Sequence, residues 1–401
     1  MNYTSAILLG VMLLWPWNAF LLATPYLRHR FLPIPTLSNN TASSIMTVST
    51  VTSVVTNMWL QTWKKDYRDR VVMGHVIIAS VFAVLAVLCV LFLWLPTAFY
   101  FCVVMLLDCL SSVGVSVAQN GSFALASERN TQGIMMGQGL AGIMPALVSL
   151  VATTAGDSVD YSSAASWSTA FSFFVATAIA GLSLFVFSRS KPAKKDLEQE
   201  PFIGEEDLTS STELRRPESP AYPVPGDEPA SNVPIRVLAE KLKAPAFSII
   251  FTFMVTLSFP IFAELVEPNN SVSQAIIPIA FVVWNGGDLL GRSICAKEKF
   301  VVKGSRNLVT YALLRFFFIP VFFLCNIKGR GAVIPSDIFY LLLQFCFGVT
   351  SGHLSSSSMM SPGAYVSKSE LSAAGGYMTL CLTIGLALGA LASFILVALI
   401  G

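Results

Sequence analysis

Long apolar stretches constrain the fold of this chain more than any other feature of its sequence. A transmembrane helix needs ~20 consecutive, mostly apolar residues, and the sequence contains eleven stretches of that kind. They cover residues 4–27, 44–63, 71–95, 98–126, 131–155, 165–188, 244–266, 272–296, 306–327, 335–360 and 371–400. The strands of a membrane barrel would instead show short segments of alternating polarity. We therefore expect an all-α integral membrane protein with eleven transmembrane helices in a lipid bilayer.

The charge content excludes a water-soluble protein of this length. Asp, Glu, Lys and Arg make up 12% of the 401 residues, and apolar residues make up 54%. Soluble domains carry about 25% charged residues, so a chain this poor in charge could not cover its surface in water. The composition excludes an ordinary cytosolic enzyme, a nucleic-acid-binding protein and a disordered chain.

One region, residues 189–243, breaks the apolar pattern. Residues 190–240 hold 11 of the 23 acidic residues and 8 of the 21 prolines. Such a segment cannot bury enough apolar surface to fold. We expect a disordered, acidic, Pro-rich cytosolic linker to which cytosolic regulators bind. It divides the chain into a six-helix half, residues 1–188, and a five-helix half, residues 244–401.

The positions of Lys and Arg predict the orientation in the membrane. With the N-terminus inside, inner loops hold 17 of these residues and outer loops hold 4. Cytoplasmic loops are enriched in Lys and Arg, so we expect a cytosolic N-terminus and an extracellular or luminal C-terminus. The sequence Asn39-Asn40-Thr41 then lies outside and makes Asn39 a candidate glycosylation site. We expect the plasma membrane rather than a vacuolar or endosomal membrane.

Reactive side chains show no pattern of catalysis or metal binding. The seven cysteines lie in or beside apolar stretches, where free Cys behaves as a small hydrophobe. The sequence contains no CxxC, HExxH or P-loop motif. It therefore indicates neither an enzyme nor a bound metal or cofactor.

Ionisable residues within the stretch 272–296 are the first candidates for function, because such groups are costly in a bilayer. Asp288 and Arg292 stand four residues apart and share one helix face with Asn285. One interpretation is a structural ion pair that neutralises itself. The other is a ligand-facing polar stripe, in which the carboxylate accepts hydrogen bonds from ligand hydroxyls and the guanidinium keeps it ionised. The two interpretations are compatible.

Other residues within the apolar stretches are open to structural and functional interpretations. Asp108, Gln119 and Arg315 could be structural or could be partners across the bundle. Trp17 follows Pro16 in the middle of the first stretch, where it could pack against a flat ligand. Glycines recur at four-residue spacing, a pattern that lets membrane helices pack closely; the pairs are Gly287 with Gly291 and Gly348 with Gly352.

Short motifs recur in order along almost the whole chain. They include Pro16-Trp17-Asn18-Ala19-Phe20, Gly137-Gln138-Gly139-Leu140-Ala141-Gly142, Phe259-Pro260, Asn285-Gly286-Gly287-Asp288-Leu289-Leu290-Gly291-Arg292 and Leu314-Arg315. With these motifs the chain resembles the equilibrative nucleoside transporter family. The resemblance implies a major-facilitator-like 6+5 pseudo-symmetric bundle whose halves rock around a central site. It also implies facilitated, bidirectional transport of nucleosides, and of nucleobases in some members.

The resemblance also implies roles for individual residues. Asp288 and Arg292 would bind the ribose hydroxyls, and Gln119 would meet the base. Residues that would line the base pocket are Trp17, Leu14 and Leu386, and those that would form the outer gate are Leu21, Pro260, Phe281 and Asn285. Asn285 also belongs to the substrate-binding face. Near an inner charged gate we place Arg70 and Glu370.

Three alternatives remain at this level. The first is a proton-coupled nucleoside or nucleobase transporter. The second is a carrier of the same fold for another small organic solute, such as an organic cation. The third is a receptor or scaffold that binds a ligand without moving it. Competition by excess nucleoside would separate the first two.

Overall fold

The computed structural model describes residues 1–155, 163–190, 233–268 and 276–400, and these are helical almost throughout. The first half contains α1 (Tyr3–Arg30), α2 (Pro35–Asn39), α3 (Thr41–Leu60), α4 (Tyr67–Leu91), α5 (Thr97–Leu125), α6 (Glu128–Ala155) and α7 (Ser163–Arg189). The second contains α8 (Ile235–Lys241), α9 (Lys243–Thr256), α10 (Phe259–Leu265), α11 (Ile276–Ile294), α12 (Ser305–Arg315), α13 (Phe318–Phe322), α14 (Asp337–Met360) and α15 (Leu371–Ile400). Each of the eleven apolar stretches coincides with a helix or a broken helix.

Two of these stretches are broken at a predictable distance from a proline. A proline ring clashes with the carbonyl group four residues earlier in a helix. Accordingly, α9 ends at Thr256, four residues before Pro260, and α12 ends at Arg315, five residues before Pro320. The chain resumes as α10 and α13.

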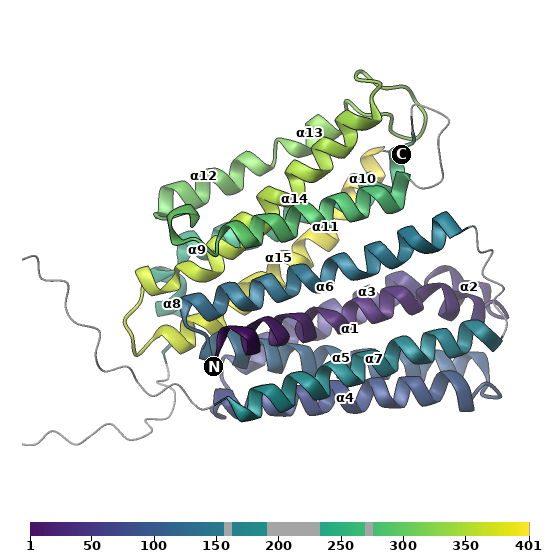
Figure 1. Ribbon diagram of the computed structural model, residues 1–401, viewed down its shortest axis with the longest axis horizontal. Coiled ribbons are helices and arrows are strands. Elements are labelled where there is room, and N and C mark those ends of the chain that lie inside the picture. The colour runs from purple at the N-terminus through teal and green to yellow at the C-terminus, as the bar shows by residue number, and fades with distance from the viewer. Residues whose placement is uncertain (156–162, 191–232, 269–275, 401) are drawn as a thin grey trace, which may run out of the picture.

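Seven helical segments among the described residues are long and apolar enough to cross a bilayer. They are Tyr3–Arg30, Tyr67–Leu91, Thr97–Leu125, Ser166–Arg189, Lys243–Ala263, Asp337–Ala364 and Leu371–Ser393. The other four predicted stretches correspond to the Ser- and Thr-rich α3, to α6 and α11, and to the broken helix α12–α13. The total of eleven spans therefore stays a prediction. Figure 1 shows the two chain ends towards opposite ends of the bundle, as an odd number of crossings requires.

The surface of the bundle is apolar where a bilayer would contact it. Large side chains that are mostly exposed include Trp94, Phe171, Phe174, Leu182 and Ile395. A soluble protein rarely exposes so many large apolar side chains. The composition and the surface thus agree on an integral, multi-pass membrane protein.

Aromatic clusters form the core of each half. In the first half, Phe20 of α1, Phe82 of α4 and Phe173 of α7 pack with ring centroids 5.6–6.0 Å apart. In the second, Phe322 of α13 lies 4.6 Å from Phe262 of α10 and 5.7 Å from Phe347 of α14. The cluster around Phe322 lies within the second half, whereas the cluster around Phe20 extends into the second half at Ile249 of α9 and Met378 of α15.

Glycines bring α11 and α14 into backbone contact. A Cβ atom at Gly291 would overlap the carbonyl oxygen of Val349, and one at Gly352 would overlap that of Asp288. The four-residue glycine spacing thus packs these helices closely, as the sequence predicts. This contact fixes the position of the α11 backbone that carries the candidate site.

The C-terminal end of the predicted linker is helical. Residues 191–232 lie outside the described residues. In contrast to the predicted range of 189–243, α8 and the first residue of α9 occupy residues 235–241 and 243. Leu238 and Leu242 are buried in the hydrophobic cluster around Phe20, which includes residues of both halves, so apolar burial stabilises this segment.

Candidate functional site

Asp288 and Arg292 form an ion pair inside the protein. The Nε atom of Arg292 lies 2.6 Å from Oδ2 of Asp288, and the residues are 6% and 5% exposed. Their four-residue spacing on α11 brings the two side chains together without any help from the rest of the fold. Breaking such a pair leaves one uncompensated charge inside the protein, which is strongly unfavourable.

The guanidinium of Arg292 also connects the two halves. Its Nη1 atom donates a hydrogen bond to the carbonyl oxygen of Met135 on α6 at 3.0 Å, and lies 3.4 Å from Oε1 of Gln138. In return, the side-chain amide of Gln132 donates to the carbonyl oxygen of Arg292 at 3.1 Å. The α6 partners Gln132 and Met135 were not predicted, and Gln138 appeared only as a motif residue.

One oxygen of Asp288 has no protein donor. Its Oδ1 atom is buried and accepts no hydrogen bond from the described residues. Buried polar atoms are hydrogen-bonded in the great majority of cases. The lack of a donor among the described residues makes Oδ1 a candidate acceptor for a ligand hydroxyl.

The substrate-facing residues predicted on α1 lie on one face and near α11. Leu14, Trp17 and Leu21 follow one another at helical spacing; the first two are half-buried and Leu21 is exposed. A Cβ atom at Gly142 of α6 would lie 2.8 Å from Oδ1 of Asn285 and 3.9 Å from Leu14. The structure therefore brings Leu14 and Asn285 to the same point of α6.

Asn18 anchors this part of α1. Its side-chain amide donates to the carbonyl oxygen of Ala141 on α6 at 2.8 Å. Buried polar groups in a membrane protein must find such partners within the fold. The bond fixes α1 beside α6 at the residue that follows Trp17.

The predicted outer-gate residues come from both halves. Leu21 lies on α1, and Phe281 lies on α11 one turn before Asn285, whose amide donates to the Phe281 carbonyl oxygen at 2.8 Å. Pro260 lies at the start of α10, and nothing is described of its side chain. Leu386 of α15, which was predicted to line the base pocket, is half-buried against the hydrophobic cluster that contains Phe20.

Asn120 makes the contact between halves on α5, while the predicted Gln119 does not. Gln119 is buried, but the amide of Asn120 lies 3.4 Å from the carbonyl oxygen of Gly376 on α15. Oδ1 of Asn120 accepts from Nη1 of Arg70 at 2.5 Å. The contact of Gln119 with a base stays a prediction.

The two predicted inner-gate residues have different partners. Arg70 is buried; besides Asn120, it donates to backbone carbonyl oxygens at Leu60 and Trp63. Glu370, next to the start of α15, pairs with Lys241 of α8 at 2.7 Å. Arg70 thus supports the contact between halves through Asn120, whereas Glu370 holds α8 onto the second half.

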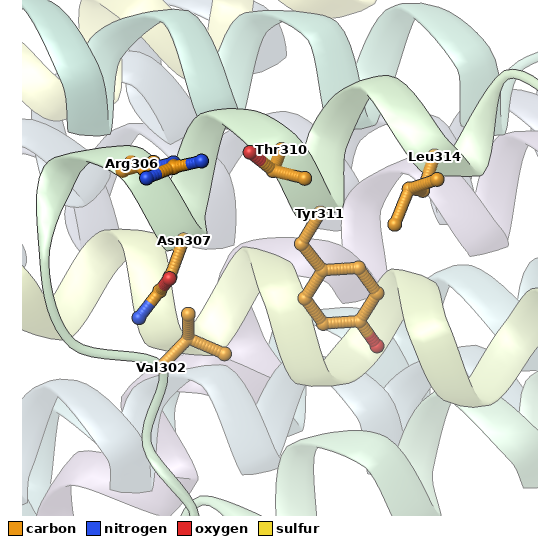
Figure 2. Close-up of a pocket in the computed structure, with 6 residues that line it drawn as sticks. All are labelled: Val302, Arg306, Asn307, Thr310, Tyr311 and Leu314. Carbon is orange, nitrogen blue, oxygen red and sulfur yellow. The ribbon is translucent and has the colours of Figure 1, made fainter.

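A groove of about 500 Å³ along α12 lies apart from this site. Figure 2 shows its wall, in which Val302 precedes α12 and Arg306, Asn307, Thr310, Tyr311 and Leu314 follow along it. None of these residues was predicted to bind a ligand. Asn39 is exposed at the end of α2, and its glycosylation stays a prediction.

Solved structures define the fold. The fucose transporter FucP of the major facilitator superfamily, in an outward conformation, matches with a TM-score of 0.57 and 13% identity over 99% of this chain and 92% of FucP. A bacterial homologue of the iron transporter ferroportin matches with a TM-score of 0.60 and 11% identity over 98% and 92% of the two chains. The fold is that of the major facilitator transporters, and the predicted 6+5 arrangement fits it.

Sequence comparison defines the family. The family model described as "Nucleoside transporter" matches residues 104–398. The nucleoside transporter FUN26 of Saccharomyces cerevisiae is 32% identical over 100% of this chain and 84% of its own length. The human equilibrative nucleoside transporter 1 is 26% identical over 98% and 96% of the two chains. The chain belongs to the nucleoside transporter family; family and fold are those of transporters and not of enzymes.

Proposed function

We propose that the protein carries nucleosides across a membrane by facilitated, bidirectional alternating access through the site at Asp288 and Arg292. The observation that carries this proposal is the buried Oδ1 atom of Asp288, which accepts no hydrogen bond from the described residues and lies beside the ion pair with Arg292. The names of the relatives in the preceding section support nucleosides as the cargo.

The chemistry of the site suits a nucleoside. A ribose hydroxyl can donate to Oδ1 of Asp288, and the Arg292 guanidinium presents several N–H donors to ribose oxygens. The flat, largely apolar base would pack against Trp17 and Leu14 of the first half and Leu386 of the second. Small-molecule sites usually combine apolar walls with a few well-placed polar groups.

Alternating access requires the two halves to separate at one end and close at the other. Arg292 binds substrate in this proposal and also donates to Met135 across the interface, so the site and the contact between halves share a residue. Hydrogen bonds that involve a charged group, such as this one, contribute ~1.5–3 kcal/mol each. A few of them can hold one end closed and still break on the time scale of domain motion.

The ion pair weighs against two alternatives. An organic cation would need a net negative site, but Arg292 neutralises Asp288. The guanidinium of Arg292 occupies Oδ2 of Asp288 at 2.6 Å, which weighs against proton transfer at this carboxylate. We therefore favour a neutral, hydroxyl-bearing cargo and propose that no proton is carried at Asp288.

Orientation, membrane and linker partners are further parts of the proposal. The distribution of Lys and Arg supports a cytosolic N-terminus, an extracellular or luminal C-terminus and a cytosolic linker. We place the protein in the plasma membrane and propose that its acidic linker binds cytosolic regulators. Deleting residues 196–230 should then leave basal uptake unchanged and abolish regulation, whereas loss of basal uptake would refute a purely regulatory linker.

The decisive experiment is uptake of labelled adenosine and uridine into cells that lack their own nucleoside carriers. We expect saturable uptake that stops at equal concentrations on both sides and that excess unlabelled nucleoside inhibits. An Asp288→Ala variant present in the membrane in equal amount should show none. Absence of uptake by the correctly inserted wild-type protein would refute nucleosides as the cargo.

A further inference from the structure

A second buried carboxylate, Asp108, lies on α5 within the first half. It is 1% exposed, and its Oδ1 atom accepts a hydrogen bond from the hydroxyl group of Ser49 on α3 at 2.7 Å. Its Oδ2 atom is buried and has no hydrogen-bond partner among the described residues. The proposed transport mechanism does not use this group.

No cation faces Asp108 from the helices packed against α5, which are α3, α4, α15 and α1. Within their bounds, α3 and α15 contain no Asp, Glu, Lys, Arg or His. The remaining titratable groups of these two helices are Tyr377 and Cys381 of α15, and the nearest ones on α5 are Cys109, Cys102 and Tyr100. An ionised carboxylate without a cationic partner is costly at this depth in a protein.

The charged groups of α4 and α1 lie towards the helix ends. On α4, the ionisable residues Tyr67, Arg68, Asp69 and Arg70 occupy the first turn, with His75 and Cys89 further along. His75 bonds to Val71 and to Ser183 of α7, and its neighbour Gly74 packs against Gly114 and Ala118, inward of Asp108. On α1, Tyr26, Arg28, His29 and Arg30 lie towards the outer end, and Arg30 lies over Tyr100.

A shallow groove of about 420 Å³ runs between the outer ends of α3 and α5. Its polar wall consists of Asn40, Ser43, Ser44 and Thr47, and its apolar wall consists of Val48, Phe101 and Met105. Val48 immediately precedes Ser49, and Met105 lies one helical turn before Asp108. The groove therefore approaches the carboxyl group from the proposed outer side and offers hydroxyl groups along which water can order.

The donor set fits a proton better than a metal ion. Ca²⁺ requires six to eight oxygen ligands and Mg²⁺ requires six, while Asp108 and Ser49 supply one carboxyl and one hydroxyl group. A neutral carboxylic acid can keep the Ser49 contact and removes the uncompensated charge. Water reaching the groove would give protons access.

We propose that Asp108 is a proton-binding site whose protonated form holds α3 against α5, so that the transport rate depends on pH. This proposal rests on the proposed function, because its pH dependence is measured as the rate of nucleoside transport. α3 also contacts the opposite half, because the amide of Asn57 donates to Thr383 and that of Gln61 donates to Gly376 on α15. Deprotonation places a charge in the α3–α5 contact and disturbs the helix that joins the halves.

The test is nucleoside exchange by the full-length protein in lipid vesicles, with the same pH on both sides so that no gradient drives transport. We expect the wild-type rate to fall at alkaline pH with the slope of a single ionisation. Asp108→Asn, which mimics the neutral acid in shape, should keep the rate found at acidic pH and lose the alkaline fall. A flat wild-type profile, or an unchanged profile in Asp108→Asn, would overturn the proposal.

Two control variants separate Asp108 from its surroundings. Cys109→Ser changes a neighbouring titratable group that accepts from Thr52 of α3, and His353→Gln removes a histidine of α14. Both should retain the alkaline fall. If the fall disappears in either control while Asp108→Asn retains it, the pH dependence belongs to another group and the proposal is wrong.

A spectroscopic measurement tests the protonation directly. Infrared spectra of the wild-type protein at neutral pH should show the C=O stretching band of a protonated carboxylic acid, and Asp108→Asn should lack it. Absence of this band in the wild type would overturn the proposal. If the wild type exchanges no nucleoside at any pH, the proposed cargo fails, and the infrared band still decides whether Asp108 binds a proton.

Discussion

Asp288 and Asp108 are both buried carboxylates, but their surroundings differ in charge. Asp288 lies 2.6 Å from a guanidinium and next to the contact between the halves, whereas Asp108 has one hydroxyl donor and lies within a single half. The pair at Asp288 keeps a charge where a ligand can use it. The site at Asp108 is compatible with a neutral acid. Both carboxylates are buried to a similar extent, so the difference between them lies in the charged partner and not in burial.

Replacing Asp288, the carboxylate that is paired with a guanidinium, should have the largest effect on nucleoside uptake. Asp288→Ala leaves Arg292 without its partner, and breaking a buried pair costs ~3–5 kcal/mol. We therefore expect nucleoside uptake to fall by more than ~100-fold, measured per molecule in the membrane. Leu290→Ala, on the exposed face of the same helix, should retain uptake. Normal uptake by Asp288→Ala would refute a special role for the paired carboxylate.

Changing the partner while keeping its charge sharpens the comparison. Arg292→Lys preserves the positive charge but lacks the planar guanidinium that reaches both Asp288 and the Met135 carbonyl oxygen. Hydrogen bonds to charged groups contribute ~1.5–3 kcal/mol, so we expect kcat/KM for uptake to fall by ~10–100-fold. A lysine variant with wild-type kinetics would show that charge alone suffices at this site.

The importance of the contact between the two halves for transport can be tested at a place distant from Asp288. A Cβ atom at Gly375 would overlap the carbonyl oxygen of Phe123 where α15 meets α5. Overpacking costs ~1–3 kcal/mol, so Gly375→Ala should slow exchange by about 5–150-fold without changing the infrared band of Asp108.

The control is Gly181→Ala on α7, since a Cβ atom there would meet nothing within 4 Å. It should leave exchange unchanged. Equal effects of the two substitutions would mean that the contact between halves does not limit transport.

Glu370 is a third carboxylate for this comparison. It lies outside the predicted spans and pairs with Lys241. The hydrogen bond from Lys241 and those from Ser367 lower the pKa of Glu370 to about 2. Its contribution to stability is therefore fully present above the ordinary Glu pKa of ~4.3 and is lost as the pH falls through about 2.

We expect Glu370→Gln to have the smallest effect and to leave the pH profile of exchange between neutral and alkaline pH unchanged. Exchange across that range, measured beside Asp108→Asn, checks this expectation. A variant without the alkaline fall would transfer the proposed pH dependence from the first half to the contact of α8 with α15.

The charged side chains also show which contacts the sequence predicts from neighbouring residues and which depend on the tertiary structure. The Asp288–Arg292 pair was predictable, because both side chains lie on one face of one helix. The breaks before Pro260 and Pro320 follow from the same kind of local geometry. By contrast, the partners of Arg70 and Glu370 were not predictable, because Asn120 and Lys241 lie 50 and 129 residues away in the chain.

The sequence by itself determined the membrane environment, the helices, the division into two halves and the ion pair of α11. Hydropathy and helical periodicity are properties of neighbouring residues, so they can be read without the fold. Only the tertiary structure decided that Arg292 donates to Met135, that Asn120 joins the halves, and that Asp108 has Ser49 as its donor. These contacts depend on which helix faces are packed together, and the packing of distant helices is set by the whole bundle.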